Sequence, residues 1–200
     1  MYTMPTIEDI LPHLSKAKVF CTVDATKGFN HLCLDDESAA LMTFKTPFGH
    51  YRWRRLCFGI LAPEIFQARM HQLLEGLSGV ACIADDILVY GCGDTVEEAL
   101  ADHDNRMIAL LDRCRGRDLH LNKDKLQVNR ETTAFMGHEL TRDGLRPDRR
   151  KIKAIVDMPP PTDCPALMRL LGLATYLAKS VPNFSQVTAK LRELLAKDVP

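Results

Sequence analysis

The chain has 200 residues, of which 46% are hydrophobic and 26% charged, so it can bury a sizeable core and is not a disordered polypeptide. Its 26 Lys and Arg residues balance its 26 Asp and Glu residues, and no apolar run is long enough to span a membrane, so we expect no membrane partner. Seven cysteines without a C-x-x-C pair favour reduced thiols in an intracellular protein over a disulfide framework or a zinc site.

The balanced net charge conceals an uneven distribution along the chain. Residues 1–103 hold 8 Lys and Arg against 14 Asp and Glu, whereas residues 104–153 hold 13 against 8. The first region could bind cations and the second could bind phosphates. Scattered, solvated surface charge also explains these counts, and composition alone favours that simpler explanation.

The first part of the chain predicts strands followed by a helix. Residues 18–25 form a short β-prone run that includes Asp24. Residues 40–59 predict two strands around a Pro-Phe-Gly turn, because proline and glycine interrupt aromatic and β-branched residues there. Residues 62–77 have apolar side chains at helical spacing, and two glycines then end the predicted helix.

A hairpin is predicted next. Residues 80–84 and 87–90 are apolar runs on either side of Asp85 and Asp86. We place both aspartates at the turn, since aspartate tolerates the backbone angles of a tight hairpin better than most residues.

The second half predicts a long helix and then strands. Thr95 and Glu98 form a capping box that opens a helix to about Arg117. Strands are predicted over residues 119–128 and 132–140. This order predicts an α+β fold in which helices pack on one side of an antiparallel sheet.

The last segment is helical after a break. Prolines interrupt the chain at residues 159–162, Asp163 can cap a leucine-rich helix, and a second helix follows Ser185.

Asp24 and Asp85 each lie at the end of an apolar β-prone run. If these strands are neighbours, the carboxylates converge, and their pKa values rise unless divalent cations neutralise them. Magnesium prefers oxygen ligands, and two ions can bind the attacking and leaving oxygens of a phosphoryl transfer. A pair of aspartates after an apolar run is a weak signal by itself, because a surface turn with two solvated carboxylates gives the same pattern.

Several stretches together resemble the reverse transcriptase of gypsy-type LTR retrotransposons and their retroviral relatives. "FCTVDATKGFNHL" and "RWRRLCFGILAPEIFQARM" resemble two motifs of the polymerase palm, and "IADDILVYG" resembles the catalytic hairpin. "LHLNKDKLQV" and "FMGHEL" resemble the motif after the second palm helix and the primer grip. The resemblance implies a palm with a remnant of the fingers over residues 1–140, and a small helical thumb with the start of the connection region over residues 141–200.

The resemblance also implies roles for individual residues. The matching catalytic carboxylates are Asp24, Asp85 and Asp86, which would bind Mg²⁺, with Mn²⁺ as an alternative, and Lys125 matches a lysine proposed to protonate the leaving pyrophosphate. The residues that match nucleotide contacts are Phe29, Phe58 and Gly59. The residues that match nucleic-acid contacts are Arg52, Arg54, Gln67, Phe135, Met136, Gly137 and His138.

An ordinary structural role is the alternative for several of these residues. Phe29 could be a core phenylalanine, Lys125 a solvated lysine and Gln67 a plain polar position on a helix. The strand alternation of "HYRWRR" would place Arg52 and Arg54 on one face, where they could hold phosphates or simply form a basic surface.

Three departures from the family pattern qualify the expected activity. The triphosphate-binding lysine and arginine of the fingers would fall before Met1. Ile83 and Ala84 replace the usual residues of the hairpin, and Cys57 replaces a proline.

The resemblance implies an RNA-directed DNA polymerase that uses a primed RNA or DNA template and deoxynucleoside triphosphates. It implies a longer polyprotein with ribonuclease H and integrase domains, located in a cytoplasmic particle or the nucleus. The alternative is a catalytically inactive, nucleic-acid-binding remnant of such a polymerase.

Overall fold

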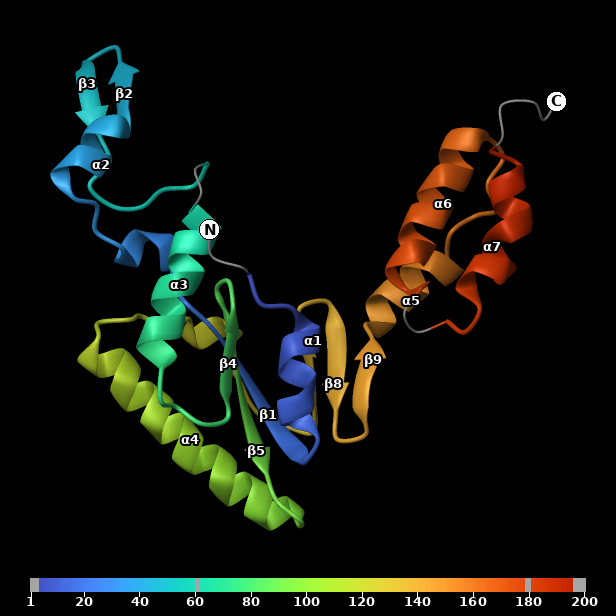
Figure 1. Ribbon diagram of the computed structural model, residues 1–200, viewed down its shortest axis with the longest axis horizontal. Coiled ribbons are helices and arrows are strands. Elements are labelled where there is room, and N and C mark those ends of the chain that lie inside the picture. The colour runs from blue at the N-terminus through green and yellow to red at the C-terminus, as the bar shows by residue number, and fades with distance from the viewer. Residues whose placement is uncertain (1–3, 60–61, 179–180, 196–200) are drawn as a thin grey trace. The chain divides into compact units, whose positions relative to one another are not determined.

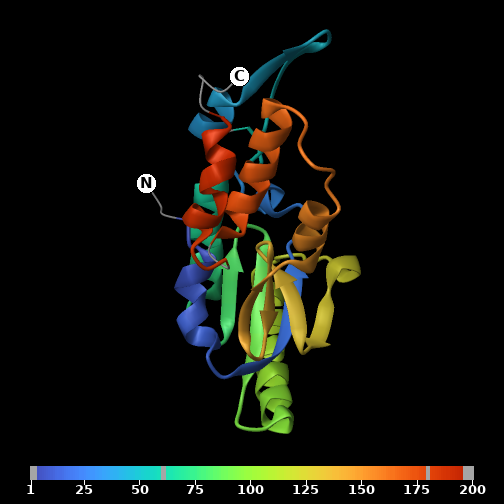
Figure 2. The ribbon, with the colours of Figure 1, turned by 90° about the vertical axis from the view of Figure 1, so that its right-hand side faces the viewer.

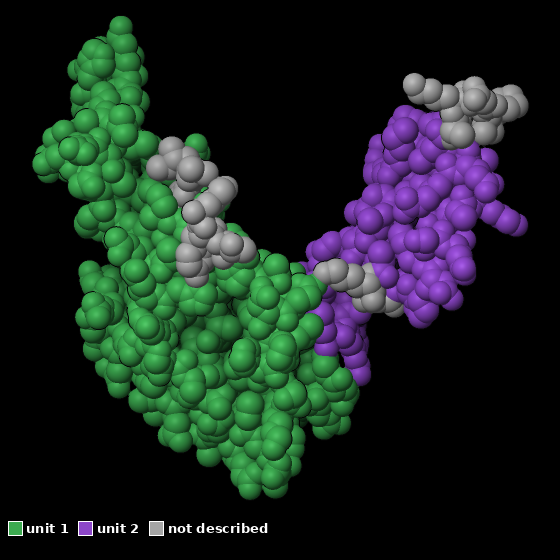
Figure 3. All heavy atoms as spheres, viewed as in Figure 1, with its two compact units in different colours: residues 1–136, 140–144 green, residues 137–139, 145–200 purple. Residues whose placement is uncertain are grey.

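A computed structural model describes residues 4–59, 62–178 and 181–195 of the chain. These residues divide into two compact units (Figure 3). Unit 1 contains residues 1–136 and 140–144, and unit 2 contains residues 137–139 and 145–200. The predicted assignment of residues 1–140 to a palm and 141–200 to a thumb stays a prediction.

Most of the elements belong to unit 1 and lead from the N-terminus to residue 135 (Figure 1). The helical elements are α1 (Ile7–Ile10), η1 (Leu11–Leu14), η2 (Gly28–His31), α2 (Asp36–Leu41), α3 (Ala62–Leu74), α4 (Val96–Gly116) and η3 (Lys123–Lys125). The strands are β1 (Ala17–Asp24), β2 (Thr43–Thr46), β3 (Gly49–Arg52), β4 (Val80–Ile83), β5 (Asp86–Cys92), β6 (Gln127–Arg130) and β7 (Thr132–Phe135).

The later elements start with β8 (His138–Thr141) and β9 (Gly144–Pro147). Together with β7, these strands form a three-stranded sheet in the order β7-β8-β9. Three helices follow, namely α5 (Arg149–Val156), α6 (Cys164–Tyr176) and α7 (Phe184–Glu193). Asp163 caps α6 as predicted, because its carboxylate accepts a hydrogen bond of 2.7 Å from the backbone N–H of Ala166.

The core of unit 1 is a four-stranded antiparallel sheet in the order β4-β5-β1-β6. Helices α3 and α4 contact one face of this sheet (Figures 1 and 2). The two central strands are almost entirely buried, and their inward side chains join those of the helices in one cluster. The predicted α+β class with helices on one side of an antiparallel sheet is therefore confirmed.

Local sequence signals set the boundaries of α4. Thr95 accepts a hydrogen bond from the N–H of Glu98, and the Glu98 carboxylate accepts one from the N–H of Thr95, so the predicted capping box is present. The helix ends at Gly116, one residue before the predicted end.

Two strand predictions in the second half are wrong. The predicted strand 119–128 is interrupted by the short helix η3, where the Asn122 side chain accepts a hydrogen bond from the N–H of Asp124, and only its last two residues belong to a strand, β6. The predicted strand 132–140 is two strands, β7 and β8, joined at Met136 and Gly137, both of which have positive φ. Positive φ at both turn residues matches the right-handed twist of a two-residue hairpin.

Candidate functional site: an acidic cluster at the end of the central strands

The predicted catalytic residues lie where β1 ends and β5 begins. In the antiparallel register, Asp24 is the direct partner of Asp86, so both side chains project from the same face of the sheet. Asp85 occupies the β4–β5 turn, and its carbonyl accepts a hydrogen bond of 3.1 Å from the N–H of Ala25. The strand pairing thus places Asp24 opposite Asp86, which lies far from it in the sequence, and next to the turn that contains Asp85.

The turn itself differs from the prediction. Only Asp85 is in the turn, because Asp86 is already the first residue of β5. The residue with left-handed backbone angles is Ala84, with φ of +53°, and neither aspartate has positive φ. The prediction that aspartate relieves the turn's backbone strain is therefore wrong.

The surroundings disfavour the ionised form of the two hairpin carboxylates. Burial raises the pKa of Asp85 above its ordinary value, and the nearby charges of Asp24 and Asp86 raise it further. Burial and the charge of Asp24 also raise the pKa of Asp86. Lys125 partly offsets both effects.

Lys125 is the cation that the chain itself places beside this cluster. Its Nζ atom lies 2.7 Å from Oδ2 of Asp24 in an ion pair. The hydrogen bond and the charge of Asp24 raise the pKa of Lys125, so the side chain stays protonated at neutral pH. The η3 turn supplies this lysine, and the Asn122 N–H donates to the carbonyl of Asp24, which ties the turn to the end of β1.

The donor set fits a divalent cation in its chemistry. Carboxylate oxygens are the ligands that magnesium prefers, and Oδ1 of Asp85 is buried without a hydrogen-bond partner. Among the residues that the structure describes, no three His, Cys, Asp or Glu side chains are already arranged around one point that could hold a metal ion. In this structure Asp24 pairs with Lys125 and Oδ1 of Asp85 lies near Gly28, and the binding of metal ions by the three predicted carboxylates stays a prediction.

Phe29, predicted to lie under the nucleotide sugar, belongs to the helix η2 and is 7% exposed. Its ring packs edge-to-face against Phe58 and Phe66, at centroid distances of 4.7 and 5.2 Å. Phe58 remains 77% exposed, and Gly59 has φ of +96°, a conformation that favours glycine. The structure thus brings together the three predicted nucleotide-contact residues beside α3.

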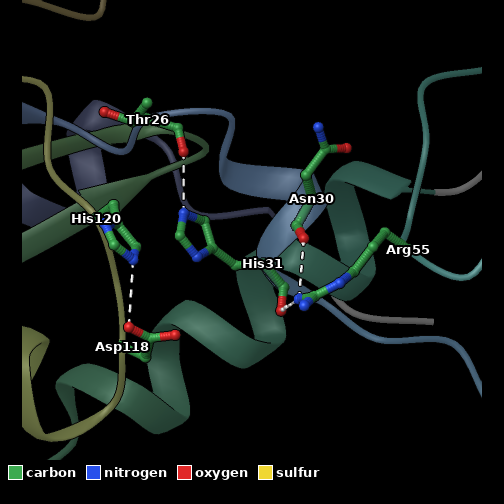
Figure 4. A network of polar contacts seen from close by, with 6 residues as sticks. All are labelled: Thr26, Asn30, His31, Arg55, Asp118 and His120. Atoms are coloured by element: carbon green, nitrogen blue, oxygen red, sulfur yellow. Dashed lines mark hydrogen bonds and ion pairs between the residues drawn. The ribbon is translucent and has the colours of Figure 1, made fainter.

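Polar contacts fix the η2 segment that carries Phe29 (Figure 4). The Arg55 guanidinium donates to the carbonyls of Asn30 and His31 at 3.3 and 3.2 Å. The His31 ring bonds the carbonyl of Thr26 and stacks on the ring of His120. Sequence reasoning missed this role of Arg55, because its acceptors are backbone atoms some 24 residues away.

The predicted phosphate-binding arginines lie on or beside the exposed β2–β3 ribbon. Arg52 forms an ion pair of 3.6 Å with Asp36, and Arg54 is exposed. The aromatic rings of Phe44, Tyr51 and Trp53 pack together on the ribbon, with centroid distances of 6.2 and 5.7 Å. Their common face agrees with the strand alternation expected for "HYRWRR".

Gln67 does not occupy the position that its predicted contact with template backbone requires. The side chain is fully buried on α3. Its Nε2 atom donates to the carbonyl of Cys82 at 2.7 Å, and its Oε1 atom accepts from the N–H of Ala84 at 2.6 Å. Both polar groups of the carboxamide are therefore used by the β4–β5 hairpin.

The predicted primer-grip residues extend from the last residue of β7, Phe135, to the first residue of β8, His138. In unit 1, Phe135 is 2% exposed and Met136 is 40% exposed. In unit 2, the carbonyl of Gly137 accepts a hydrogen bond of 2.7 Å from the hydroxyl of Tyr176, and the His138 ring stacks on the same tyrosine.

Comparison with known proteins identifies the class of this chain. Residues 1–140 match the family model described as "Reverse transcriptase (RNA-dependent DNA polymerase)". The chain therefore belongs to the reverse transcriptase family, which confirms the resemblance seen in the motifs.

Its relatives in sequence are polyproteins of mobile elements and viruses. The chain is 33% identical over 199 residues to the "Retrovirus-related Pol polyprotein from transposon 297" of Drosophila melanogaster, covering 98% of this chain and 18% of the relative. It is 30% identical over 202 residues to the "Enzymatic polyprotein" of Cauliflower mosaic virus (strain NY8153), covering 100% of this chain and 29% of the relative. The chain thus spans less than a third of the length of either polyprotein.

Solved structures support the fold. The foamy viral protease-reverse transcriptase in complex with dsDNA matches with a TM-score of 0.83 at 24% identity, over 98% of this chain and 40% of that chain. The same viral protein in complex with an RNA/DNA hybrid gives a TM-score of 0.82, over 99% of this chain and 26% of that chain. Among the described residues, no helix is both long and apolar enough to cross a membrane.

Proposed function

We propose that this chain carries the acidic site of an RNA-directed DNA polymerase, which adds deoxynucleotides to the 3′-hydroxyl of a primer. The observation that supports this function most strongly is the register of β1 and β5, which sets Asp24 opposite Asp86 with Asp85 in the adjoining turn. Mutually repelling carboxylates whose ionised forms are disfavoured bind a cation or a proton more readily, and a divalent cation is the partner that phosphoryl transfer uses.

Asp24, Asp85 and Asp86 would hold Mg²⁺ or Mn²⁺. When bound, two such ions would supply charge neutralisation at the phosphates and activation of the primer hydroxyl. The carboxylates of this chain bind and orient these ions, and the buried sheet behind them keeps the carboxylates in register.

Lys125 would supply a proton. Its raised pKa keeps the Nζ atom protonated near Asp24, within reach of a leaving pyrophosphate bound at the cluster. Phe29, Phe58 and Gly59 would border the nucleotide sugar and base, where a flat ring leaves no room for a 2′-hydroxyl.

The proposed substrates are a primed RNA or DNA template and deoxynucleoside triphosphates. Arg52 and Arg54 would contact phosphates, as would the segment from Phe135 to His138 at the primer. The relatives' names support a place in a longer polyprotein, and ribonuclease H and integrase domains are proposed as its other parts. We propose a cytoplasmic particle or the nucleus as its location.

Primer extension tests the proposed function directly. The chain is incubated with a primed template, deoxynucleotides and Mg²⁺, and extension is compared with the Asp24→Asn and Asp86→Asn variants. Extension should be lost in both variants and kept in Asp112→Asn, which removes an exposed carboxylate on α4 that pairs only locally with Arg115. Extension that survives both Asp24→Asn and Asp86→Asn contradicts the proposal.

Binding without catalysis is the second candidate function. The observation that favours it is the Asp24–Lys125 ion pair, which already neutralises one carboxylate within the chain. This function requires template-primer binding that weakens with salt, no extension, and unchanged binding in the Asp24→Asn variant. Titration of a labelled primed template at two salt concentrations separates it from the polymerase.

A further inference from the structure

The carboxamide of Gln67 takes the place of a neighbouring strand at the edge of the central sheet. β4 is an edge strand, with β5 on one side. Gln67 donates to the carbonyl of Cys82 and accepts from the N–H of Ala84, two residues further along the chain. A peptide group of a paired strand makes the same two kinds of bond, so the free edge is satisfied where the turn begins.

The turn needs such support because its backbone is strained. Ala84 has φ of +53°, which is uncommon for a residue with a side chain and has an energetic cost. Three contacts hold the turn in this conformation. Gln67 accepts from the Ala84 N–H, the Cys82 thiol lies 3.2 Å from the Ala84 carbonyl, and the Ala25 N–H donates to the carbonyl of Asp85.

Phe66, the residue before Gln67, lies near Gly28, on the side of the turn that carries the Asp85 carboxylate. A Cβ atom added to Gly28 would lie 2.7 Å from both Oδ1 of Asp85 and Cζ of Phe66, so these three residues meet at one point. Helix α3 therefore bonds the turn through the carboxamide of Gln67 and places the ring of Phe66 beside Gly28, which Oδ1 of Asp85 also approaches.

We propose that Gln67 is a positioning residue, which fixes the Ala84–Asp85 turn and thereby orients the carboxylates of Asp85 and Asp86 for cation binding. The cation-binding part rests on the proposed function, whereas the fixing of the turn does not. A residue that only joined α3 to β4 would stabilise the fold without any particular effect on the Ala84 amide or on the carboxylates.

The first test compares Gln67→Met, which keeps the length of the side chain and removes both hydrogen bonds, with Met70→Ala. Met70 is 2% exposed on the same helix, so its truncation disturbs the same core while the Gln67 bonds remain. Amide hydrogen exchange is measured by NMR, together with Mn²⁺ affinity from the line broadening of the amides at 85 and 86. In Gln67→Met, exchange of the Ala84 amide should rise roughly 10- to 100-fold more than that of the β5 amides.

In Met70→Ala the exchange of all these amides should rise together. Mn²⁺ affinity should fall roughly tenfold in Gln67→Met and stay within about twofold in Met70→Ala. Equal acceleration of all amides in Gln67→Met overturns the positioning role. Faster exchange at Ala84 with unchanged Mn²⁺ affinity keeps the fixing of the turn and overturns its link to the carboxylates. If the wild-type chain shows no Mn²⁺ broadening, the proposed cation site fails while the exchange result still decides the role in the turn.

Gln67→Glu provides a second test that does not depend on Gln67→Met folding. A protonated carboxyl group can donate to Cys82 and accept from Ala84 as the carboxamide does, whereas an ionised one cannot donate. Protection of the Ala84 amide should therefore match the wild type at low pH. At higher pH the buried carboxylate faces the Cys82 carbonyl without a proton to donate, and this repulsion should drive it away from the turn and expose the Ala84 amide. Protection of the Ala84 amide is also measured in the wild type at each pH, which controls for any effect of the titration of Asp85 and Asp86. Protection of Gln67→Glu that is independent of pH contradicts the proposal.

Discussion

Unit 1 contains two β-hairpins of similar size whose surroundings are opposite. In β4–β5, the side chains of Ile87, Leu88 and Val89 are fully buried, and β1 and α3 contact the hairpin from both sides. In β2–β3, nearly every residue is exposed, and Phe48 at the tip is 89% exposed.

The two turns are also held differently. The β2–β3 turn is closed by its own Thr46, whose hydroxyl accepts from the N–H of Phe48 and donates to the carbonyl of Gly49. The β4–β5 turn is held by residues that are distant in sequence, Gln67 and Ala25. Local bonds suffice to form a ribbon, but a carboxylate that must hold a fixed position needs contacts from neighbouring elements.

The largest expected difference between the hairpins is in amide hydrogen exchange. The β5 amides are buried between two strands and should open only with unit 1 as a whole, whereas those of β2–β3 should open locally. We expect exchange at Val89 to be at least roughly 1,000-fold slower than at Tyr51 after correction for intrinsic rates. Similar protection of the amides in the two hairpins would contradict the expected difference between local opening of β2–β3 and opening of β5 with unit 1 as a whole.

Truncation of one side chain in each hairpin should lower the free energy of unfolding by different amounts. Ile87→Ala removes a fully buried side chain and should lower the free energy of unfolding by about 2–5 kcal/mol. Phe44→Ala, on the exposed ribbon, should lower it by less than about 1 kcal/mol. Urea unfolding of both variants measures the difference, and a similar loss in the two would contradict the account.

A smaller effect is expected from the charge of Asp86. Its pKa in the folded chain is raised above the ordinary value of 3.8, so ionisation costs the folded state stability as the pH rises through that range, and the cost is fully present at neutral pH. Asp86→Asn should therefore raise the melting temperature by roughly 1–4 °C at pH 7 and by less at pH 3. Asp112→Asn on α4 is the control, and a lower melting temperature for Asp86→Asn at pH 7 would contradict the stated burial effect.

Features encoded by local patterns could be predicted from the sequence. The buried strands β1 and β5 correspond to apolar runs, and the capping box at Thr95 set the start of α4 correctly. The expected neighbourhood of the strand that ends at Asp24 and the hairpin of Asp85 and Asp86 is present. Periodicity, capping and motif order need only neighbouring residues, so one sequence contains them.

Features that depend on packing were missed. The sequence does not show that Gln67 meets the edge of β4, because that contact exists only after α3 has packed on the sheet. The break at Met136 and Gly137 had a usable signal, since a glycine inside a β-prone run often marks a turn. Asn122, two residues before Asp124, was a similar unused signal for the turn before β6.

Cation binding at the acidic cluster tests the central claim most directly. Mn²⁺ is titrated into the wild-type chain and the Asp24→Asn, Asp86→Asn and Lys125→Met variants, with affinity taken from NMR line broadening. We expect selective broadening around Asp24, Asp85 and Asp86, its loss in both Asn variants, and tighter binding in Lys125→Met, where the competing ammonium is removed from Asp24. Broadening that is unchanged in both Asn variants would contradict the account.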